Sequence, residues 1–172
     1  MHTKGFTLFF AMLVGALALA VGLAIYDLTL RELDLSIVAT QSQYAIYAAD
    51  TGAECALYWD SKCTLGGCAA GSAFATSSNT NGGTFPPPSG VICNGQDIAS
   101  TPAWVVASTA TAATTTFTIY ASAQSQVAAT TTCATVTVAK RNNPSATTVT
   151  SHGYNSCIAN TLKFERILQI SY

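Results

Sequence analysis

Six cysteines are the residues of this chain whose side chains can most readily react with one another. All of them follow a long apolar run that begins at Phe6, and they are Cys55, Cys63, Cys68, Cys93, Cys133 and Cys157. An even number of cysteines beyond an apolar segment is typical of an exported domain, in which thiols are oxidised to disulfides. We therefore expect up to three disulfides, although spacing alone leaves their connectivity open.

The preferred pair is Cys133 with Cys157, because these two residues bracket a predicted hairpin. The other four cysteines are then expected to join the end of a helix to the loop that follows it. A zinc site is the competing possibility, but Cys63 and Cys68 lack the two-residue spacing of a zinc knuckle and have no histidine near them. Disulfides are favoured, and no metal or other cofactor is expected.

Acid–base or nucleophilic catalysis would need groups that the sequence does not bring together. His152 is the only histidine beyond the apolar run, and it lies beside Gly153 in a predicted loop without a serine elbow or a carboxylate pair. Cys157 is close to His152 in sequence, but the even cysteine count favours a disulfide over a nucleophilic thiol. Asp50 and Glu54 fit an exposed helix face better than a catalytic pair. We therefore expect that the chain is not an enzyme.

Charged residues make up 9% of the 172 residues, and the formal net charge is −1. This composition gives no broad basic surface, so binding to nucleic acid is not expected. Lys140, Arg141, Lys163 and Arg166 could serve a binding surface, but scattered, solvated charges are the favoured interpretation.

The remaining chemistry is proteolytic. The predicted site is Lys4-Gly5-Phe6, and the apolar run from Phe6 to Tyr26 begins directly after Gly5. A conventional secretory signal is cut after its apolar stretch, whereas a cut after Gly5 would leave this stretch on the mature protein. About 21 apolar residues cross a bilayer core once. His2 and Lys4 favour a cytoplasmic N-terminus, so the rest of the chain is expected outside.

The helical pattern continues beyond Tyr26 and predicts one helix from Phe6 to about Trp59, roughly 80 Å long. Such a helix needs a packing partner along its outer half, and small residues there would let a sheet approach closely. The apolar positions of the outer half are Leu30, Leu33, Ile37, Tyr44, Tyr47 and Ala48, and the small residues are Ala48, Ala49, Gly52, Ala53 and Ala56. The alternative is a single-pass anchor followed by a short juxtamembrane helix.

This arrangement resembles the class III signal of type IV prepilins, whose peptidase cuts after a glycine and methylates the new N-terminal residue, usually phenylalanine. Gly5 and Phe6 match these positions. Residues 41–60 are also similar to PilX-type minor pilins in their tyrosines, Ala49-Asp50 and Glu54-Cys55. The resemblance implies a leader at 1–5, a transmembrane helix half at 6–26, an amphipathic continuation at 27–60 and an extracytoplasmic head at 61–172.

One position departs from the family pattern. Major pilins carry glutamate as the fifth mature residue, where it neutralises the N-terminus of a neighbouring subunit, but here that residue is Phe10. An unpaired terminal ammonium in an apolar filament core is costly. The resemblance therefore implies a minor subunit with a role at the tip, in initiation or in adhesion.

The head is expected to be α+β, with a type IV pilin-like antiparallel sheet packed on the long helix. Residues 61–102 read as a long disulfide-braced loop, with breakers at Leu65-Gly66-Gly67, Asn81-Gly82-Gly83 and Pro86-Pro87-Pro88. Alternation of apolar and polar residues predicts strands at 114–120, 133–139 and 146–151, with a turn at 140–145. A last strand is expected at 164–172, and residues 104–106 could form the first strand of the sheet.

The favoured function is that of a minor type IV pilin, first in the cytoplasmic membrane and then in an extracellular pilus at the cell surface. Its implied partners are prepilin peptidase and other pilin subunits, which it would contact through the N-terminal helix. The alternatives are a pseudopilin of a type II secretion system and a membrane-anchored surface binding module whose ligand the sequence does not identify.

Overall fold

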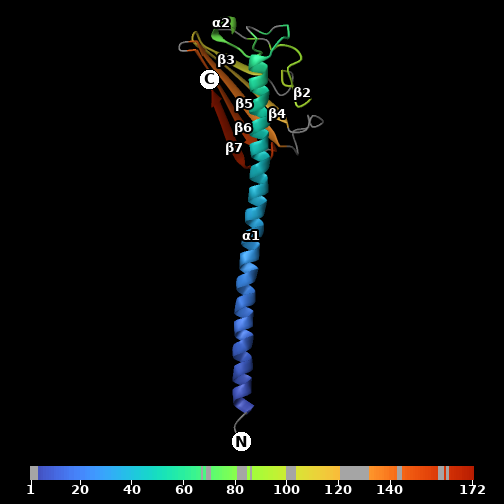
Figure 1. Cartoon of the computed structure of the whole chain (residues 1–172), viewed down its shortest axis with the longest axis vertical. Helices are drawn as coiled ribbons and strands as arrows, with labels where there is room; N and C mark the ends of the chain where they lie inside the picture. The colour runs from blue at the N-terminus through green and yellow to red at the C-terminus, as the bar shows by residue number, and fades with distance from the viewer. Residues whose placement is uncertain are drawn as a thin grey trace. The chain divides into compact units, whose positions relative to one another are not determined.

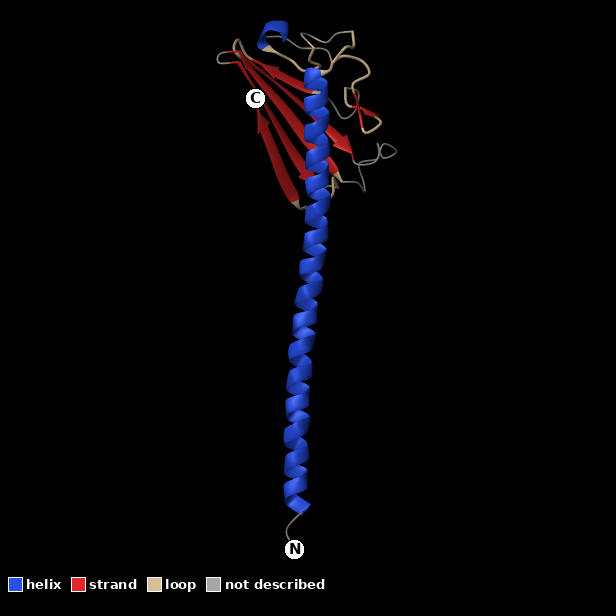
Figure 2. Cartoon of the chain, in the orientation of Figure 1, coloured by secondary structure: helices blue, strands red, loops and turns tan. Residues whose placement is uncertain are grey.

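The computed structural model describes residues 4–66, 68, 71–80, 85, 87–99, 104–120, 132–142, 145–158, 161 and 163–172. The fold is α+β: one long N-terminal helix, α1, and an antiparallel sheet in the C-terminal half (Figure 1; Figure 2). The chain divides into two compact units, Met1–Thr40 and Gln41–Tyr172, and each is described below by itself.

Helix α1 spans Lys4–Ser61 without interruption, as its helical pattern and its lack of proline predict. The first unit consists of its N-terminal part, in which every large apolar side chain from Phe6 to Val38 is exposed. The most apolar window of α1 has a mean hydropathy of 2.6, so by length and composition this helix is able to cross a membrane. His2, from which a cytoplasmic N-terminus is predicted, lies outside the described residues.

The main sheet has five strands in the order β3-β4-β5-β6-β7, and every neighbouring pair is antiparallel. The strands are β3 (Val105–Ser108), β4 (Ala112–Tyr120), β5 (Cys133–Asn142), β6 (Ser145–Tyr154) and β7 (Glu165–Ser171). All five predicted strand regions are confirmed. Alternating burial along β4 and β5 places Phe117, Ile119, Val136 and Val138 in the core, as their sequence spacing indicates.

Two predictions about the ends of these strands are wrong. The predicted turn at 140–145 is shorter, because β5 continues to Asn142 and β6 begins at Ser145; Asn143 and Pro144 lie outside the described residues. His152 was predicted in a loop, but β6 extends past it to Tyr154. The strand continues because Gly153 pairs with both Ala134 and Arg166, in a register that leaves no room for a turn.

In the second unit α1 packs on the sheet through its small residues. Ala45, Ala48, Ala49, Gly52, Ala53 and Ala56 are all buried. The predicted close approach at 48–56 is therefore confirmed. The tyrosines of the predicted apolar face do not take part, because Tyr44 is 51% and Tyr47 is 66% exposed. Bulky rings on this face would hold the helix too far from the sheet for backbone-close packing.

The segment between α1 and the main sheet is more ordered than the loop that its glycines and prolines predict. It contains the short helix α2 (Ser77–Thr80) and a hairpin of β1 (Ile92–Cys93) with β2 (Gln96–Asp97). Phe74, Val91 and Ile98 are fully buried, and Phe74 stacks on Phe117 with ring centroids 5.7 Å apart. The segment thus supplies part of the core. The predicted breakers Gly67, Asn81-Gly82-Gly83 and Pro86 lie outside the described residues.

All six cysteines are paired. Cys133 is bonded to Cys157, the pair that the sequence favours. Cys55 is bonded to Cys93 and so ties α1 to the β1–β2 hairpin, while Cys63 and Cys68 close a small loop just after α1. No thiol is therefore left for catalysis, and no group of three or more His, Cys, Asp or Glu side chains that could hold a metal is found among the described residues.

Candidate functional site

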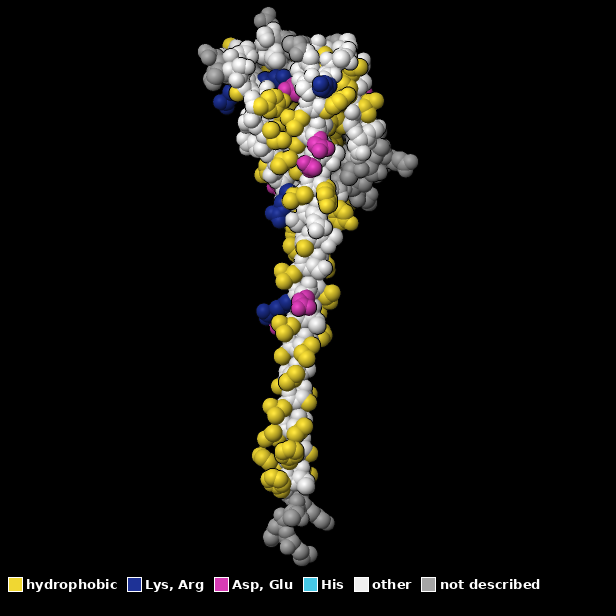
Figure 3. All heavy atoms as spheres, in the orientation of Figure 1, with side chains coloured by type: hydrophobic (Ala, Val, Ile, Leu, Met, Phe, Trp, Pro, Cys, Tyr) yellow, Lys and Arg dark blue, Asp and Glu magenta, His cyan; other side chains and the backbone are white. Residues whose placement is uncertain are grey.

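The predicted processing site lies at the start of α1. Gly5 is helical, and the Phe6 side chain that follows it is 73% exposed. Phe10, the fifth residue after the predicted cleavage site, is 58% exposed and belongs to the apolar surface of the first unit. Figure 3 shows hydrophobic side chains along this part of α1. Such a surface needs lipid or other protein around it, because exposed apolar patches of this size are rare in soluble monomers.

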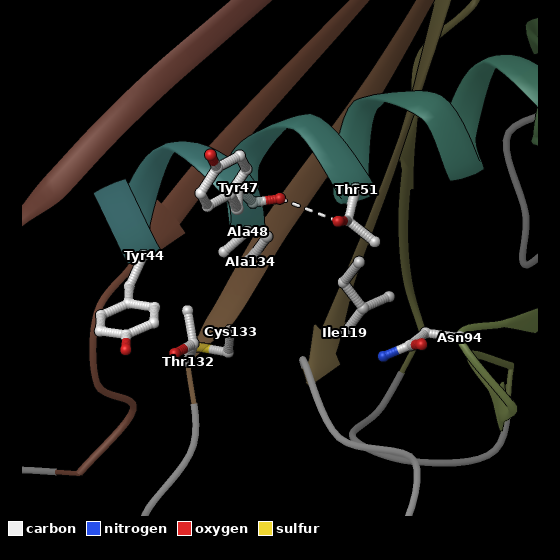
Figure 4. Close-up of a pocket in the computed structure, with 9 residues that line it drawn as sticks. All are labelled: Tyr44, Tyr47, Ala48, Thr51, Asn94, Ile119, Thr132, Cys133 and Ala134. Atoms are coloured by element: carbon white, nitrogen blue, oxygen red, sulfur yellow. Dashed lines mark hydrogen bonds between the residues drawn. The ribbon is translucent and has the colours of Figure 1, made fainter. Parts of the chain in front are cut away.

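A pocket of about 180 Å³ lies in the second unit beside the outer half of α1 (Figure 4). Four residues of α1 form one wall: Tyr44, Tyr47, Ala48 and Thr51. The Thr51 hydroxyl donates a hydrogen bond of 2.8 Å to the Tyr47 carbonyl. The remaining lining comes from the β1–β2 turn, from β4 and from the start of β5: Asn94, Ile119, Thr132, Cys133 and Ala134.

Asn94 is placed in this pocket by its backbone. It has φ 50° and precedes Gly95 at φ 74°, a pair of left-handed residues that suits a two-residue hairpin turn. Its amide nitrogen donates a 3.0 Å hydrogen bond to the Tyr120 carbonyl, which ties the hairpin to β4. The Asn94-Gly95 dipeptide is a hairpin signal in the sequence, so the prediction of a loop over residues 61–102 misses this turn.

The pocket is lined by aromatic, aliphatic, hydroxyl and amide side chains. Among the lining residues that the structure describes there is no carboxylate, imidazole or free thiol, because Cys133 is in a disulfide. The volume is below the range of about 300–1,000 Å³ that is usual for small-molecule pockets. A volume of this size takes one side chain or one sugar ring beside the rings of Tyr44 and Tyr47.

His152 lies in a small polar cluster on the sheet. Its Nδ1 is 2.6 Å from Glu165 Oε1, and the Tyr154 hydroxyl donates to the same oxygen at 3.1 Å. The hydrogen bond with His152 lowers the pKa of the Glu165 carboxyl, and the one from Tyr154 adds to this effect. Burial raises the pKa of Tyr154, as does its bond to Glu165. The cluster joins β6 to β7.

The basic residues considered for surface binding are not equivalent. Lys140 forms an ion pair with Asp60 at the end of α1, and its side chain is only 12% exposed. Arg166 donates from Nε to the Ser42 hydroxyl at 2.8 Å, and Lys163 lies 5.9 Å from the centre of the Tyr154 ring. Arg141 is exposed. Lys140 is therefore removed from the candidate binding residues.

Asp60 is the centre of a polar network that its sequence neighbourhood does not predict. Besides Lys140, it accepts hydrogen bonds from Ser72 at 2.6 Å and from the Tyr172 hydroxyl at 2.6 Å. Burial alone would raise the pKa of Asp60, but the hydrogen bonds from Lys140, Ser72 and Tyr172 outweigh it and lower this pKa. No local pattern reveals the network, since its four members are spread over 113 residues, from position 60 to position 172.

Asp50 and Glu54 are both exposed on α1, as predicted. Asp50 lines a second, open groove beside β7, and the sequence offers no signal for that groove.

Comparisons with protein-family models, with curated proteins and with solved structures found no match to this chain.

Proposed function

We propose that this protein is a minor type IV pilin that is cut after Gly5, methylated on Phe6 and assembled into a pilus through α1. The observation that carries the proposal is the continuity of α1. It is a single helix of 58 residues, exposed and apolar over its first part and lined with small buried residues where it meets the sheet. A membrane span alone requires only about 20 residues.

Other features support the same proposal. Three disulfides brace the head, which suits an oxidising extracytoplasmic compartment. Phe10 provides no carboxylate for a neighbouring N-terminus, which favours a place at the tip or in initiation over the repeating shaft.

Intact-mass analysis of the membrane form tests this proposal. In cells that contain prepilin peptidase, we expect a chain that starts at Phe6 and carries one methyl group. In cells without the peptidase, we expect residues 1–5 to remain. A mature chain that keeps Met1 to Gly5 in the presence of the enzyme would rule out the prepilin assignment.

The tyrosine-lined pocket favours a second candidate function, that of a surface binding module. Tyr44 and Tyr47 present two exposed rings one helical turn apart, a geometry that suits contact with a sugar ring or an apolar side chain. Loss of adhesion in a Tyr44→Ala, Tyr47→Ala variant that still assembles into pili would support this role. Unchanged adhesion in that variant would exclude the pocket from it.

A further inference from the structure

β7 forms one edge of the main sheet. β7 is the last strand in the order, and no described strand pairs with its outer side (Figure 2). Its seven residues contain no proline, and its register with β6 runs from Thr148–Ser171 to Tyr154–Glu165 without a bulge. Proline, bulges and short length are the usual devices that protect an edge strand from pairing. β7 has none of them.

The register shows which backbone groups face the open side. Tyr172 and Thr147 exchange both N–H···O bonds, at 2.8 and 3.0 Å, and the Asn155 N–H donates to the Phe164 carbonyl. In an antiparallel ladder such pairs alternate with pairs that do not exchange hydrogen bonds. The residues of β7 whose N–H and C=O groups point away from β6 are therefore Glu165, Ile167, Gln169 and Ser171.

A groove of about 400 Å³ runs along the helix side of β7. Ile46, Ala49 and Leu168 give it an apolar floor, and Arg166 and Asp50 give it two charged groups. The Arg166 side chain is held by Ser42. The Asp50 side chain is exposed and makes no hydrogen bond or ion pair with any residue that the structure describes.

We propose that β7 and this groove bind an extended segment of another protein by strand addition. The free N–H and C=O groups, two residues apart, specify an extended backbone, because only a strand presents partners at that repeat. The groove then takes the alternate side chains of the segment that face α1. Its apolar floor suits aliphatic residues, and Asp50 suits a lysine or arginine among them.

A second copy of this chain is a poorer occupant. Two β7 strands that pair in antiparallel fashion would be related by a twofold axis perpendicular to the sheet. Residues 41–61 of the two copies would then run in opposite directions. Copies that are inserted in one membrane by the same N-terminal helix all run in the same direction, so a separate protein with a free extended segment fits better.

The test uses the full chain in detergent micelles and a fluorescent synthetic peptide. The peptide has about eight residues, alternates valine with threonine and carries one arginine on its valine face. We expect saturable binding by fluorescence anisotropy. We also expect slower hydrogen exchange at Ile167 and Gln169. The same peptide with alternate N-methylated amides should not bind, because it cannot donate to β7.

Three variants make the test specific. Gln169→Pro removes an N–H that faces the open edge and is not needed by β6, so it should weaken binding about tenfold or more while the fold is kept. Gln169→Ala keeps that N–H and is the matched control. Asp50→Asn should weaken binding roughly two- to fivefold at low salt, because the pair is solvent-exposed.

The outcomes are decisive because they concern only the head and do not depend on cleavage at Gly5. No binding to the unmodified chain, or equal binding by Gln169→Pro and Gln169→Ala, would overturn the proposal. Self-association that Gln169→Pro abolishes would assign the edge to a second copy and overturn the proposed occupant.

Discussion

Gly153 of β6 lies directly under the backbone of Ala45 in α1, so close that a Cβ added to Gly153 would overlap the Ala45 carbonyl oxygen. The same Cβ would lie 2.8 Å from the Ala49 Cβ. No rotamer change relieves this overlap, because the two nearest atoms, the Ala45 carbonyl oxygen and the Ala49 nitrogen, belong to the helix backbone, and the Ala49 Cβ cannot rotate away. The contact fixes the distance between helix and sheet in the head.

Gly153→Ala is therefore expected to destabilise the head strongly. Overpacking usually costs about 1–3 kcal/mol, and contact with rigid backbone places this substitution at or above the upper end. Urea unfolding of the full chain in detergent, followed by tryptophan fluorescence, measures the loss. Gly66→Ala is the matched control, because a Cβ there meets nothing within 4 Å. Equal stability of the two variants would refute the close approach.

The Asp60–Lys140 ion pair predicts a loss of stability in acid. The folded state lowers the pKa of Asp60, so the ionised carboxylate stabilises the fold. This contribution is complete above the unfolded pKa of about 3.9 and is lost as the pH falls towards the lower folded value. Urea unfolding midpoints can be measured between pH 6 and pH 2 for the wild type and for Asp60→Asn. The difference between the two midpoints should become smaller as the pH falls and disappear near pH 2.

Lys140, the cation of that ion pair, gives an independent check that the pair is buried. Lys140→Met leaves the Asp60 carboxylate buried without its cation, and removal of one member of a buried pair costs about 3–5 kcal/mol. Arg141→Met, one residue further along β5 at an exposed position, should change stability by less than about 0.5 kcal/mol. Similar losses in both variants would mean that Lys140 is solvated.

The elements with strong local patterns were predictable from the sequence, and contacts between distant segments were not. Period-two alternation predicts β4 and β5, and the lack of breakers predicts α1, because each pattern reflects burial along its own element. The path of the 61–102 segment was missed, since its burial depends on Phe74 meeting Phe117 across 43 residues. The tyrosine pocket was missed for the same reason: Tyr44, Asn94 and Thr132 meet only in the fold.

The three disulfides should differ in their contribution to stability. They close loops with sequence separations of 38, 24 and 5 residues. Chain-entropy arguments assign about 4 kcal/mol to the Cys55–Cys93 disulfide, about 3.5 kcal/mol to Cys133–Cys157 and about 2 kcal/mol to Cys63–Cys68. Paired Cys→Ser variants, compared by thermal unfolding without reductant, should follow this order. A larger loss for Cys63–Cys68 than for Cys55–Cys93 would contradict it.

Ser151 of β6 predicts a substitution that stabilises the head. Its side chain is fully buried, and its hydroxyl has no hydrogen-bond partner in the described part of the chain. An unsatisfied buried hydroxyl costs about 1–3 kcal/mol, so Ser151→Ala should raise the free energy of unfolding by about 1 kcal/mol, less a small packing loss. Urea denaturation at pH 7 measures this change.

Gly52 of α1 allows the same site to be tested by a double-mutant cycle. A Cβ on Gly52 would lie 2.5 Å from the Ser151 hydroxyl oxygen and 2.7 Å from Val136 Cγ2. Gly52→Ala should therefore be destabilising, although alanine is the better helix former by about 1 kcal/mol. In the Ser151→Ala background one of these two close contacts is gone, so the same substitution should cost less. Additive effects of the two substitutions would mean that the residues do not touch, since independent sites add within about 0.5 kcal/mol.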